Sequence, residues 1–323
     1  MTIRCLCCGR PITDAATEDE KEWNWHRKCV RSFFGTDRLP ELELTDEVLN
    51  LLARRSVDQG LTVPGVQRKM SLHLAEGTQT RLTVVNYPTG YILKPQTPEY
   101  CHLPEYEQMT MLMADAVGIQ TVPHALLHMN ESYAYITRRI DRDLKKKNVR
   151  LYAMEDFCQL SGRVTADKYK GSYENCGKVI NRYSFYSGFD LSELYLRVLF
   201  SFMTGNSDMH LKNFSLIETE PGGRKFRLSS AYDMLPVNVI LPEDSEQMAL
   251  TVNGKKRNLH RNDFLKLANT IGVEKKAALH IMENLLCQKE KMMKICYDSN
   301  LSEEEREKVC FLMEERCAAL KNA

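Results

Sequence analysis

Three polar side chains in the second half of the chain have the types and the spacing that phosphoryl transfer requires. Asp208 and Asn213 form an Asp-x₄-Asn pattern, and Asp233 follows twenty residues after the asparagine. Phosphoryl transfer needs an acidic group at the attacking hydroxyl and oxygen ligands that hold Mg²⁺ against the phosphates. These three residues can supply both parts, so the pattern predicts a phosphotransferase site.

The segment after Asn213 predicts how Asp233 returns to it. Residues 214–217 and 225–228 have the pattern of two short strands, and Pro221-Gly-Gly223 lies between them. Proline and glycine between two such runs are typical of a hairpin turn. A hairpin here would bring Asp233 back beside Asn213.

The segments before residues 205–213 predict which elements support those residues. Residues 190–203 have a strongly apolar helical pattern that leads directly into residues 205–213. We expect this helix to be the buried spine of a helical lobe. Residues 171–188 are rich in glycine, serine, tyrosine and asparagine, and we expect them to form a loop.

A lysine and a glutamate upstream form a second candidate pair. Residues 91–95, Tyr-Ile-Leu-Lys-Pro, have the pattern of a strand that ends near Lys94, and a lysine facing a core needs an anionic partner. Residues 104–117 have helical periodicity with Glu107 in the first turns and Gly118 as terminator. A Lys94–Glu107 pair would mimic the strand-lysine to helix-glutamate contact of protein kinases. The alternative is an edge lysine that reaches solvent.

A glycine turn precedes that strand. Residues 61–74 contain Gly65, Val66, Gln67 and Lys69 ahead of an alternating strand pattern. Backbone amides and basic side chains in such a turn could hold phosphates, although the stretch lacks the Walker pattern. A plain hairpin turn is the alternative. A further strand pattern at 133–140 completes the order of a small nucleotide lobe followed by a helical lobe.

Cysteine and histidine are clustered at the amino terminus. Cys5 and Cys8 form a Cys-x₂-Cys pair with a glycine beside it, and His26 and Cys29 form a His-x₂-Cys pair after seventeen intervening residues. Two such pairs suit tetrahedral Zn²⁺, and four protein ligands leave no open position, so we expect a structural metal. Cys7 is expected to be a spectator, although it could replace a neighbour. The alternative is that these are small buried thiols.

Composition limits the class of protein. The chain has 323 residues, of which 43% are hydrophobic and 27% are charged, and its net charge is +1. This composition argues against a largely disordered chain. A near-neutral net charge also gives no overall basic field that would attract nucleic acid. Neither an apolar run of about 18 residues nor a signal-peptide core is visible. We therefore expect a cytoplasmic protein with no membrane partner and mainly reduced thiols.

Together these pieces resemble the HipA-like serine/threonine kinase family, the toxin half of bacterial toxin–antitoxin operons. The resemblance covers residues 56–275, and the stretch 205–213 is its most specific part. The matching motifs, in family order, are Gly65-Val-Gln-Arg-Lys69, Ile92-Leu-Lys94, Glu107, Arg138-Arg-Ile-Asp-Arg142, Glu155-Asp-Phe-Cys-Gln159, Lys168-Tyr169, Gly205–Asn213 and Tyr232-Asp233.

The resemblance implies a role for each matched position. Asp208 is similar to the catalytic base, and Asn213 and Asp233 are similar to the Mg²⁺ ligands. Lys94 is similar to the lysine that contacts ATP phosphates, with Glu107 as its helix partner. The remaining expected nucleotide contacts are Gly65, Val66, Gln67 and Lys69 in the glycine loop, Arg139 in a hinge at 136–139, and His210 beside the catalytic aspartate. For His210, a structural histidine is the alternative.

Two features depart from the family pattern. The family autophosphorylates a hydroxyl in the glycine loop, and the matching residue here is Thr62, which is followed by Pro64. We expect Thr62 to be phosphorylated in cis. Long HipA proteins begin with a small β-rich subdomain, whereas this chain begins with the Cys/His cluster, as in a shortened HipT-like form with a knuckle attached. The missing subdomain could be a separately encoded small protein.

The resemblance also implies partners and an architecture. It implies a HipB-like helix-turn-helix antitoxin, contact with DNA only through that antitoxin, and an aminoacyl-tRNA synthetase as substrate, with translation arrest as the outcome. The expected fold is α+β and protein-kinase-like. Its expected domains are a zinc-knuckle module at 1–40, a small mixed β/α N-lobe at 41–142 and a helical C-lobe at 143–323. The alternatives are a catalytically idle zinc-bearing adaptor that binds protein or DNA, and a small-molecule kinase.

Overall fold

The computed structural model describes residues 3–42, 69–75, 80–83, 89–143 and 149–321. The chain divides into two compact units, which are described separately. The first comprises residues 1–105 and 123–139, and the second comprises residues 106–122 and 140–323. None of the described helices is long and apolar enough to cross a membrane.

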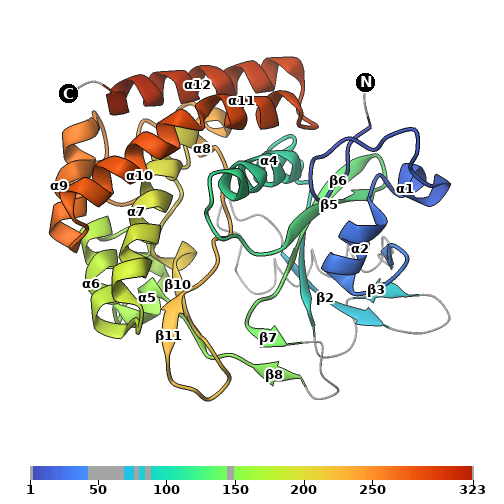
Figure 1. Cartoon of the computed structure of the whole chain (residues 1–323), viewed down its shortest axis with the longest axis horizontal. Helices are drawn as coiled ribbons and strands as arrows, with labels where there is room; N and C mark the ends of the chain where they lie inside the picture. Colours follow the sequence, from blue (N-terminus) through green and yellow to red (C-terminus); the bar gives the residue numbers. More distant parts are fainter. Residues whose placement is uncertain (1–2, 43–68, 76–79, 84–88, 144–148, 322–323) are drawn as a thin grey trace. The chain divides into compact units, whose positions relative to one another are not determined.

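The first unit is built on a six-stranded sheet (Figure 1). The strand order is β1-β3-β2-β4-β6-β5, and the pairs are antiparallel except that β1 and β3 are parallel. Asn130, at φ 54°, occupies the two-residue turn between β5 and β6 in the left-handed conformation that asparagine tolerates. The strands are β1 (Glu41–Leu42), β2 (Met70–Ala75), β3 (Arg81–Thr83), β4 (Tyr91–Pro95), β5 (His124–Met129) and β6 (Ser132–Arg138).

Two short N-terminal helices belong to the same unit. Helix α1 (Glu18–Trp23) begins at a capping box formed by Thr17 and Glu20, and helix α2 (Arg27–Phe34) ends at Gly35 in the left-handed conformation. The buried face of α2 includes Phe33 and Phe34. Their rings pack against Tyr91 of β4, so the N-terminal segment shares its core with the sheet.

The second unit is mainly helical and contains two small sheets (Figure 1). One has the order β11-β10-β9, and the other pairs β7 with β8. The strands are β7 (Arg142–Asp143), β8 (Arg150–Leu151), β9 (Met154–Asp156), β10 (Ser215–Glu218) and β11 (Phe226–Leu228). The helices are α4 (Leu103–Ala116, which begins in the first unit), α5 (Phe157–Leu160), α6 (Tyr173–Tyr183), α7 (Ser187–Thr204), α8 (Val237–Ile240), α9 (Arg261–Ile271), α10 (Lys275–Cys287), α11 (Lys289–Tyr297) and α12 (Glu303–Lys321), with 3₁₀ turns η1 (Thr165–Asp167) and η2 (Leu211–Asn213).

Several predicted elements are confirmed. The helix expected at 104–117 is α4, and Gly118 follows it at φ 90°. The hairpin expected after Asn213 is the antiparallel pair β10–β11. The apolar helix expected at 190–203 is α7, which is buried along most of its length.

The loop expected at residues 171–188 is wrong. Most of this segment is helix α6, which begins at Ser172, whose side chain accepts a hydrogen bond from the Asn175 amide. The helix buries one face, which includes Cys176, Val179 and Ile180. Spacing at i, i+3 and i+4 indicates a helix, and the polar composition of the segment hid it.

Candidate functional site

The expected catalytic stretch begins where α7 ends. Gly205 caps this helix at φ 71°, a left-handed conformation that glycine adopts without strain. A Cβ atom at this position would lie 2.3 Å from Leu312 Cδ2. The chain therefore turns sharply here, and Asn206, which is fully buried, accepts a hydrogen bond from the Asp208 amide at 3.3 Å.

Asp208 is held from two sides. The Tyr169 hydroxyl donates to Asp208 Oδ1 at 2.5 Å, and Asn213 Nδ2 donates to the Asp208 backbone carbonyl at 3.0 Å. Burial, followed by the charge of Asp208, raises the pKa of Tyr169 well above its ordinary value, so the phenol remains a donor at neutral pH. The side chain of Asp208 is therefore oriented by a neutral hydroxyl.

Lys212 anchors the same stretch to β9. Its Nζ lies 2.6 Å from Asp156 Oδ2. Asp156 is also the N-cap of α5, where its side chain and that of Gln159 form a capping box. The Glu155–Gln159 motif of the resemblance is thus a helix start that also holds residues 205–213 through Lys212.

Asp233 returns to the neighbourhood of Asn213 through the hairpin. The Tyr232 hydroxyl lies 2.6 Å from Ser215 Oγ and donates to the Lys212 carbonyl at 3.2 Å. These two contacts bracket Asn213 and fix the residue immediately before Asp233. Asp233 itself has φ 62°, a conformation that is uncommon outside glycine but is tolerated by aspartate.

His210, which lies between Asp208 and Asn213 in the chain, is buried. It is 5% exposed, and its ring packs edge-on against Tyr169 with centroids 5.0 Å apart. Burial lowers the pKa of His210 from its ordinary 6.5, and the charge of Asp208 opposes this shift only in part. His210 is therefore a neutral imidazole at pH 7, and its Nδ1 has no hydrogen-bond partner among the described residues.

The expected nucleotide-contacting residues are spread over both units. Lys94 is 3% exposed on β4 in the first unit, whereas Glu107 is fully buried in the part of α4 that belongs to the second. The Lys94–Glu107 pair stays a prediction. Arg139 follows β6, where its amide donates to the Gly90 carbonyl at 2.8 Å, and Lys69 is exposed just before β2.

Four expected residues of the glycine loop lie outside the described residues. They are Thr62, Gly65, Val66 and Gln67.

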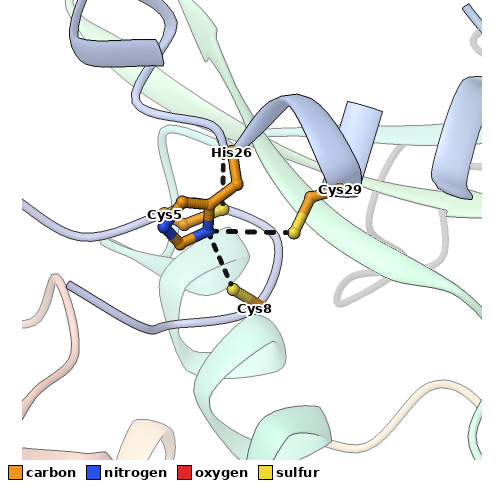
Figure 2. Close-up of side chains that lie close together, drawn as sticks. All are labelled: Cys5, Cys8, His26 and Cys29. Carbon is orange, nitrogen blue, oxygen red and sulfur yellow. Dashed lines mark hydrogen bonds between the residues drawn. The ribbon is translucent and has the colours of Figure 1, made fainter. Parts of the chain in front are cut away.

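The Cys/His cluster is a compact candidate metal centre in the first unit (Figure 2). The ligand atoms of Cys5, Cys8, His26 and Cys29 all lie within 4.8 Å of one another. His26 Nδ1 is 3.4 Å from Cys8 Sγ and 3.9 Å from Cys29 Sγ. His26 Nε2 lies 3.2 Å from the Pro11 carbonyl, a contact that favours the proton on Nε2 and leaves the Nδ1 lone pair directed at the thiols.

Tyr169 is a site residue to which sequence reasoning assigned no role. It belongs to the Lys168-Tyr169 motif, but it precedes Asp208 by 39 positions, so local spacing could not place it on the carboxylate. Lys168 Nζ lies 4.9 Å from the centre of the tyrosine ring. The Lys168-Tyr169 motif was therefore the signal that the sequence offered, but only the fold shows that Tyr169 contacts Asp208.

Comparison with known proteins gives consistent sequence matches. The HipA-like C-terminal domain family matches residues 61–293. A Haemophilus influenzae protein named "Putative kinase" is 25% identical over 281 residues, which cover 79% of this chain and 80% of that protein. The serine/threonine-protein kinase toxin HipA of Shewanella oneidensis is 27% identical over 210 residues, which cover 58% of this chain and 45% of the toxin. The chain thus spans about half the length of that toxin.

Solved structures show the same fold. The Shewanella oneidensis structure of a complex of HipA, HipB and operator DNA matches with a TM-score of 0.67 at 18% identity, over 80% of this chain and 64% of the matched chain. The Helicobacter pylori proinflammatory kinase CtkA matches with a TM-score of 0.54 at 15% identity, over 80% of this chain and 92% of the other. The expected kinase-like α+β fold is therefore confirmed.

Proposed function

Since this chain belongs to the HipA-like C-terminal domain family, we propose that it is an ATP- and Mg²⁺-dependent serine/threonine protein kinase. The observation that carries the proposal is the arrangement around Asp208. The Asp208 carboxylate is held by Tyr169, and the Asp208 backbone carbonyl is held by Asn213, just beyond the end of a buried helix in a fold that kinases share. Such a carboxylate can orient a hydroxyl for attack on a γ-phosphoryl group.

The proposed role of Asp208 follows from its hydrogen bonds. Tyr169 occupies Oδ1, and no hydrogen bond from a described residue reaches Oδ2. The substrate hydroxyl that is to be phosphorylated can therefore donate a hydrogen bond to Oδ2 while Tyr169 holds Oδ1 in place. Phosphoryl transfer depends mainly on positioning and electrostatics, so a carboxylate that is already oriented lowers the cost of aligning the attacking oxygen.

Asn213 and Asp233 are the proposed Mg²⁺ ligands. Mg²⁺ prefers oxygen ligands, and a carboxylate with an amide oxygen fits that preference. Asn213 uses Nδ2 for the Asp208 carbonyl, which leaves its Oδ1 as an acceptor. When bound, Mg²⁺ neutralises charge on the phosphates. The protein's contribution is to hold the two ligands through the Tyr232 contacts and the β10–β11 hairpin.

The nucleotide itself is proposed to contact Lys94, Arg139 and His210, together with the loop that contains Gly65, Val66, Gln67 and Lys69. Lys94 suits a phosphate because a buried ammonium group needs anionic partners, and Glu107 is proposed as its second partner. The buried, neutral His210 suits a hydrogen-bonding role beside Asp208 more than a charge-carrying one.

Zinc is the proposed ion of the Cys/His cluster. Three thiolates and an imidazole are a frequent structural set, and four protein ligands leave no position for a reacting molecule. The contact of His26 Nε2 with the Pro11 carbonyl supports the tautomer that a metal requires. The proposed zinc is therefore structural.

The proposed biological role is that of a cytoplasmic toxin kinase. The matched Shewanella HipA is named as a toxin, and its structure contains HipB and operator DNA. By this similarity we expect a HipB-like antitoxin as partner, and we expect contact with DNA only through that antitoxin. Copurification would test whether the chain also assembles with a separately encoded small subdomain. An aminoacyl-tRNA synthetase is the expected substrate, and arrest of translation is the expected outcome.

Transfer of labelled γ-phosphate into a cell lysate tests the kinase proposal. Asp208→Asn preserves the shape of the side chain and removes its charge, so protein labelling should fall by at least about a hundredfold. Asp167→Asn is a matched control, because Asp167 pairs with Lys170 near the surface and should not affect labelling. Intact-mass and peptide analysis of the same active protein should show phosphate on Thr62.

The possible results separate the alternatives. A protein band labelled by the wild type and by Asp167→Asn, but not by Asp208→Asn, supports the kinase and yields its substrate. ATP turnover on a metabolite without protein labelling would favour a small-molecule kinase. No turnover by a folded, zinc-loaded protein would favour the idle adaptor. Unmodified Thr62 in active protein would refute autophosphorylation alone.

A further inference from the structure

Strand β5 lies at the edge of the six-stranded sheet, and the N-terminal segment covers the middle of that edge. An uncovered edge strand exposes N–H and C=O groups that can pair with other chains. The Leu126 amide donates to the Leu6 carbonyl at 3.0 Å, and the Leu126 carbonyl accepts a hydrogen bond from the Trp25 indole at 3.2 Å. Two residues further along, Asn24 Nδ2 lies 3.0 Å from His128 Nε2.

The residues that contact β5 are the neighbours of the proposed metal ligands. Leu6 follows Cys5 directly, and Trp25 precedes His26 directly. The Leu6 amide also donates to the Asn24 carbonyl at 2.8 Å, which joins the two segments. An ion bound by both ligand pairs would therefore fasten the two segments that hold the strand edge (Figure 2).

The fourth ligand connects the cluster to the interior of the sheet. Cys29 lies on α2, and the same helix places Phe33 and Phe34 with ring centroids 5.9 Å and 5.4 Å from that of Tyr91 on β4. The Tyr91 hydroxyl donates to the Phe33 carbonyl at 3.4 Å. Trp25 is fully buried in this aromatic group. The N-terminal segment therefore has no separate core of its own.

A line of packed side chains leads from β5 to Lys94. The His124 ring on β5 stacks on Tyr135 with centroids 6.3 Å apart and an interplanar angle of 14°. Lys94 Nζ lies 5.2 Å from the centre of the same tyrosine ring, and Lys94 and Tyr135 are opposite each other in the β4–β6 pair. The position of β5 thus influences the surroundings of the buried lysine.

We propose that the Cys/His cluster is a zinc-dependent clamp that holds the β5 edge of the sheet and, through His124 and Tyr135, the position of Lys94. The inference rests on the proposed zinc site and is independent of phosphoryl transfer. Zinc binding to the folded unit stabilises that unit by linkage, because the ligands are separated in the unfolded chain. The cluster then serves the sheet and need not recognise another molecule.

Hydrogen exchange of the full chain, before and after chelation of its zinc, tests the clamp. Metal analysis should give one zinc per chain before chelation. After chelation, amides of residues 124–129 should exchange at least about tenfold faster, and zinc should restore their protection. Residues 187–204 of α7, in the other unit, should be unchanged. After chelation, the reactivity of Lys94 toward an amine-reactive reagent should rise severalfold, while the reactivity of Lys170, which is already exposed, should not change.

Three variants separate binding of the ion from its effect on the strand. Cys29→Ser should lose zinc and reproduce the fast exchange of residues 124–129. Trp25→Phe keeps an aromatic ring but removes the indole donor, so it should retain zinc and still exchange faster at the β5 edge. Cys287→Ser, which changes an exposed thiol on α10, should behave as the wild type in both measurements.

Each unfavourable result overturns a defined part of the proposal. A chain that contains no zinc and takes up neither Zn²⁺ nor Co²⁺ has no metal site, and the clamp is wrong. A chain that binds one zinc but keeps full protection of residues 124–129 after chelation has a metal site without a clamp. Increased exchange with unchanged Lys94 reactivity would overturn the link to the lysine. None of these measurements requires kinase activity.

Discussion

Removal of one hydroxyl tests how the proposed catalytic carboxylate, Asp208, is positioned. Tyr169→Phe deletes the donor to Asp208 Oδ1 and keeps the ring that packs on His210. A hydrogen bond to a charged group contributes about 1.5–3 kcal/mol. Tyr169 is 43% exposed, so water can replace part of the loss and the lower value applies. A loss of about 1.5 kcal/mol in the transition state corresponds to a rate about tenfold lower.

The assay is single-turnover transfer of labelled γ-phosphate at saturating ATP, with Tyr183→Phe as the matched control. Tyr183 is 38% exposed on α6, so it resembles Tyr169 in exposure but is not hydrogen-bonded to Asp208. Tyr169→Phe should lower the single-turnover rate about tenfold. The ATP concentration that gives half of the maximal rate, measured in a separate titration, should stay nearly constant, because the removed hydroxyl contacts the Asp208 carboxylate.

An unchanged rate would show that Asp208 does not depend on the hydroxyl for its orientation. A higher rate would show that Tyr169 blocks the oxygen that the substrate hydroxyl must reach. Either result refutes the positioning argument while leaving the role of Asp208 to the Asp208→Asn comparison.

Three further substitutions test the surroundings of the site. Gly205→Ala should lower the free energy of unfolding in urea by about 2 kcal/mol, because a left-handed residue gains a Cβ that Leu312 must move to accept. His210→Gln should remove part of the loss of folding stability at acid pH. Burial lowers the pKa of His210 in the folded state, so the unfolded state binds more protons below pH 6.5. The free energy of unfolding therefore falls there only while His210 is present. Lys212→Met should cost about 1 kcal/mol of stability and lower the transfer rate, because it removes the ion pair with Asp156.

Each of these has a contrary result. Equal urea midpoints for wild type and Gly205→Ala would mean that the helix end accommodates a methyl group. Identical losses of stability between pH 7 and pH 5 in wild type and His210→Gln would assign that dependence to other groups. A fully active Lys212→Met protein would show that the Tyr232 contacts suffice to hold the stretch.

The local parts of the proposed site could be predicted from the sequence because their geometry depends on short spacings. Asp208 and Asn213 are five positions apart, and one turn of chain is enough to link them through the Asn213 amide. The pairs Cys5–Cys8 and His26–Cys29 have the same property. The apolar pattern of residues 190–203 predicted the burial of α7.

The long-range parts could not be predicted in this way. The contact between Tyr169 and Asp208 joins residues that are 39 positions apart, and the contact between Lys212 and Asp156 joins residues that are 56 positions apart. Helix α6 was missed because its polar residues outweighed its buried face, which only packing identifies. Patterns of hydrophobicity describe which face of an element is buried, but they do not state which partner covers it.

The sequence by itself predicted the residues proposed to hold Mg²⁺, the four Cys/His residues proposed to hold zinc, and the buried helix that leads into residues 205–213. Tertiary structure alone decided that the four Cys/His residues lie beside the sheet, where the neighbouring Leu6 and Trp25 both contact Leu126. The physical reason is that an edge strand must satisfy its outward N–H and C=O groups, and any segment long enough to reach it can do so. Only the folded chain shows which segment did.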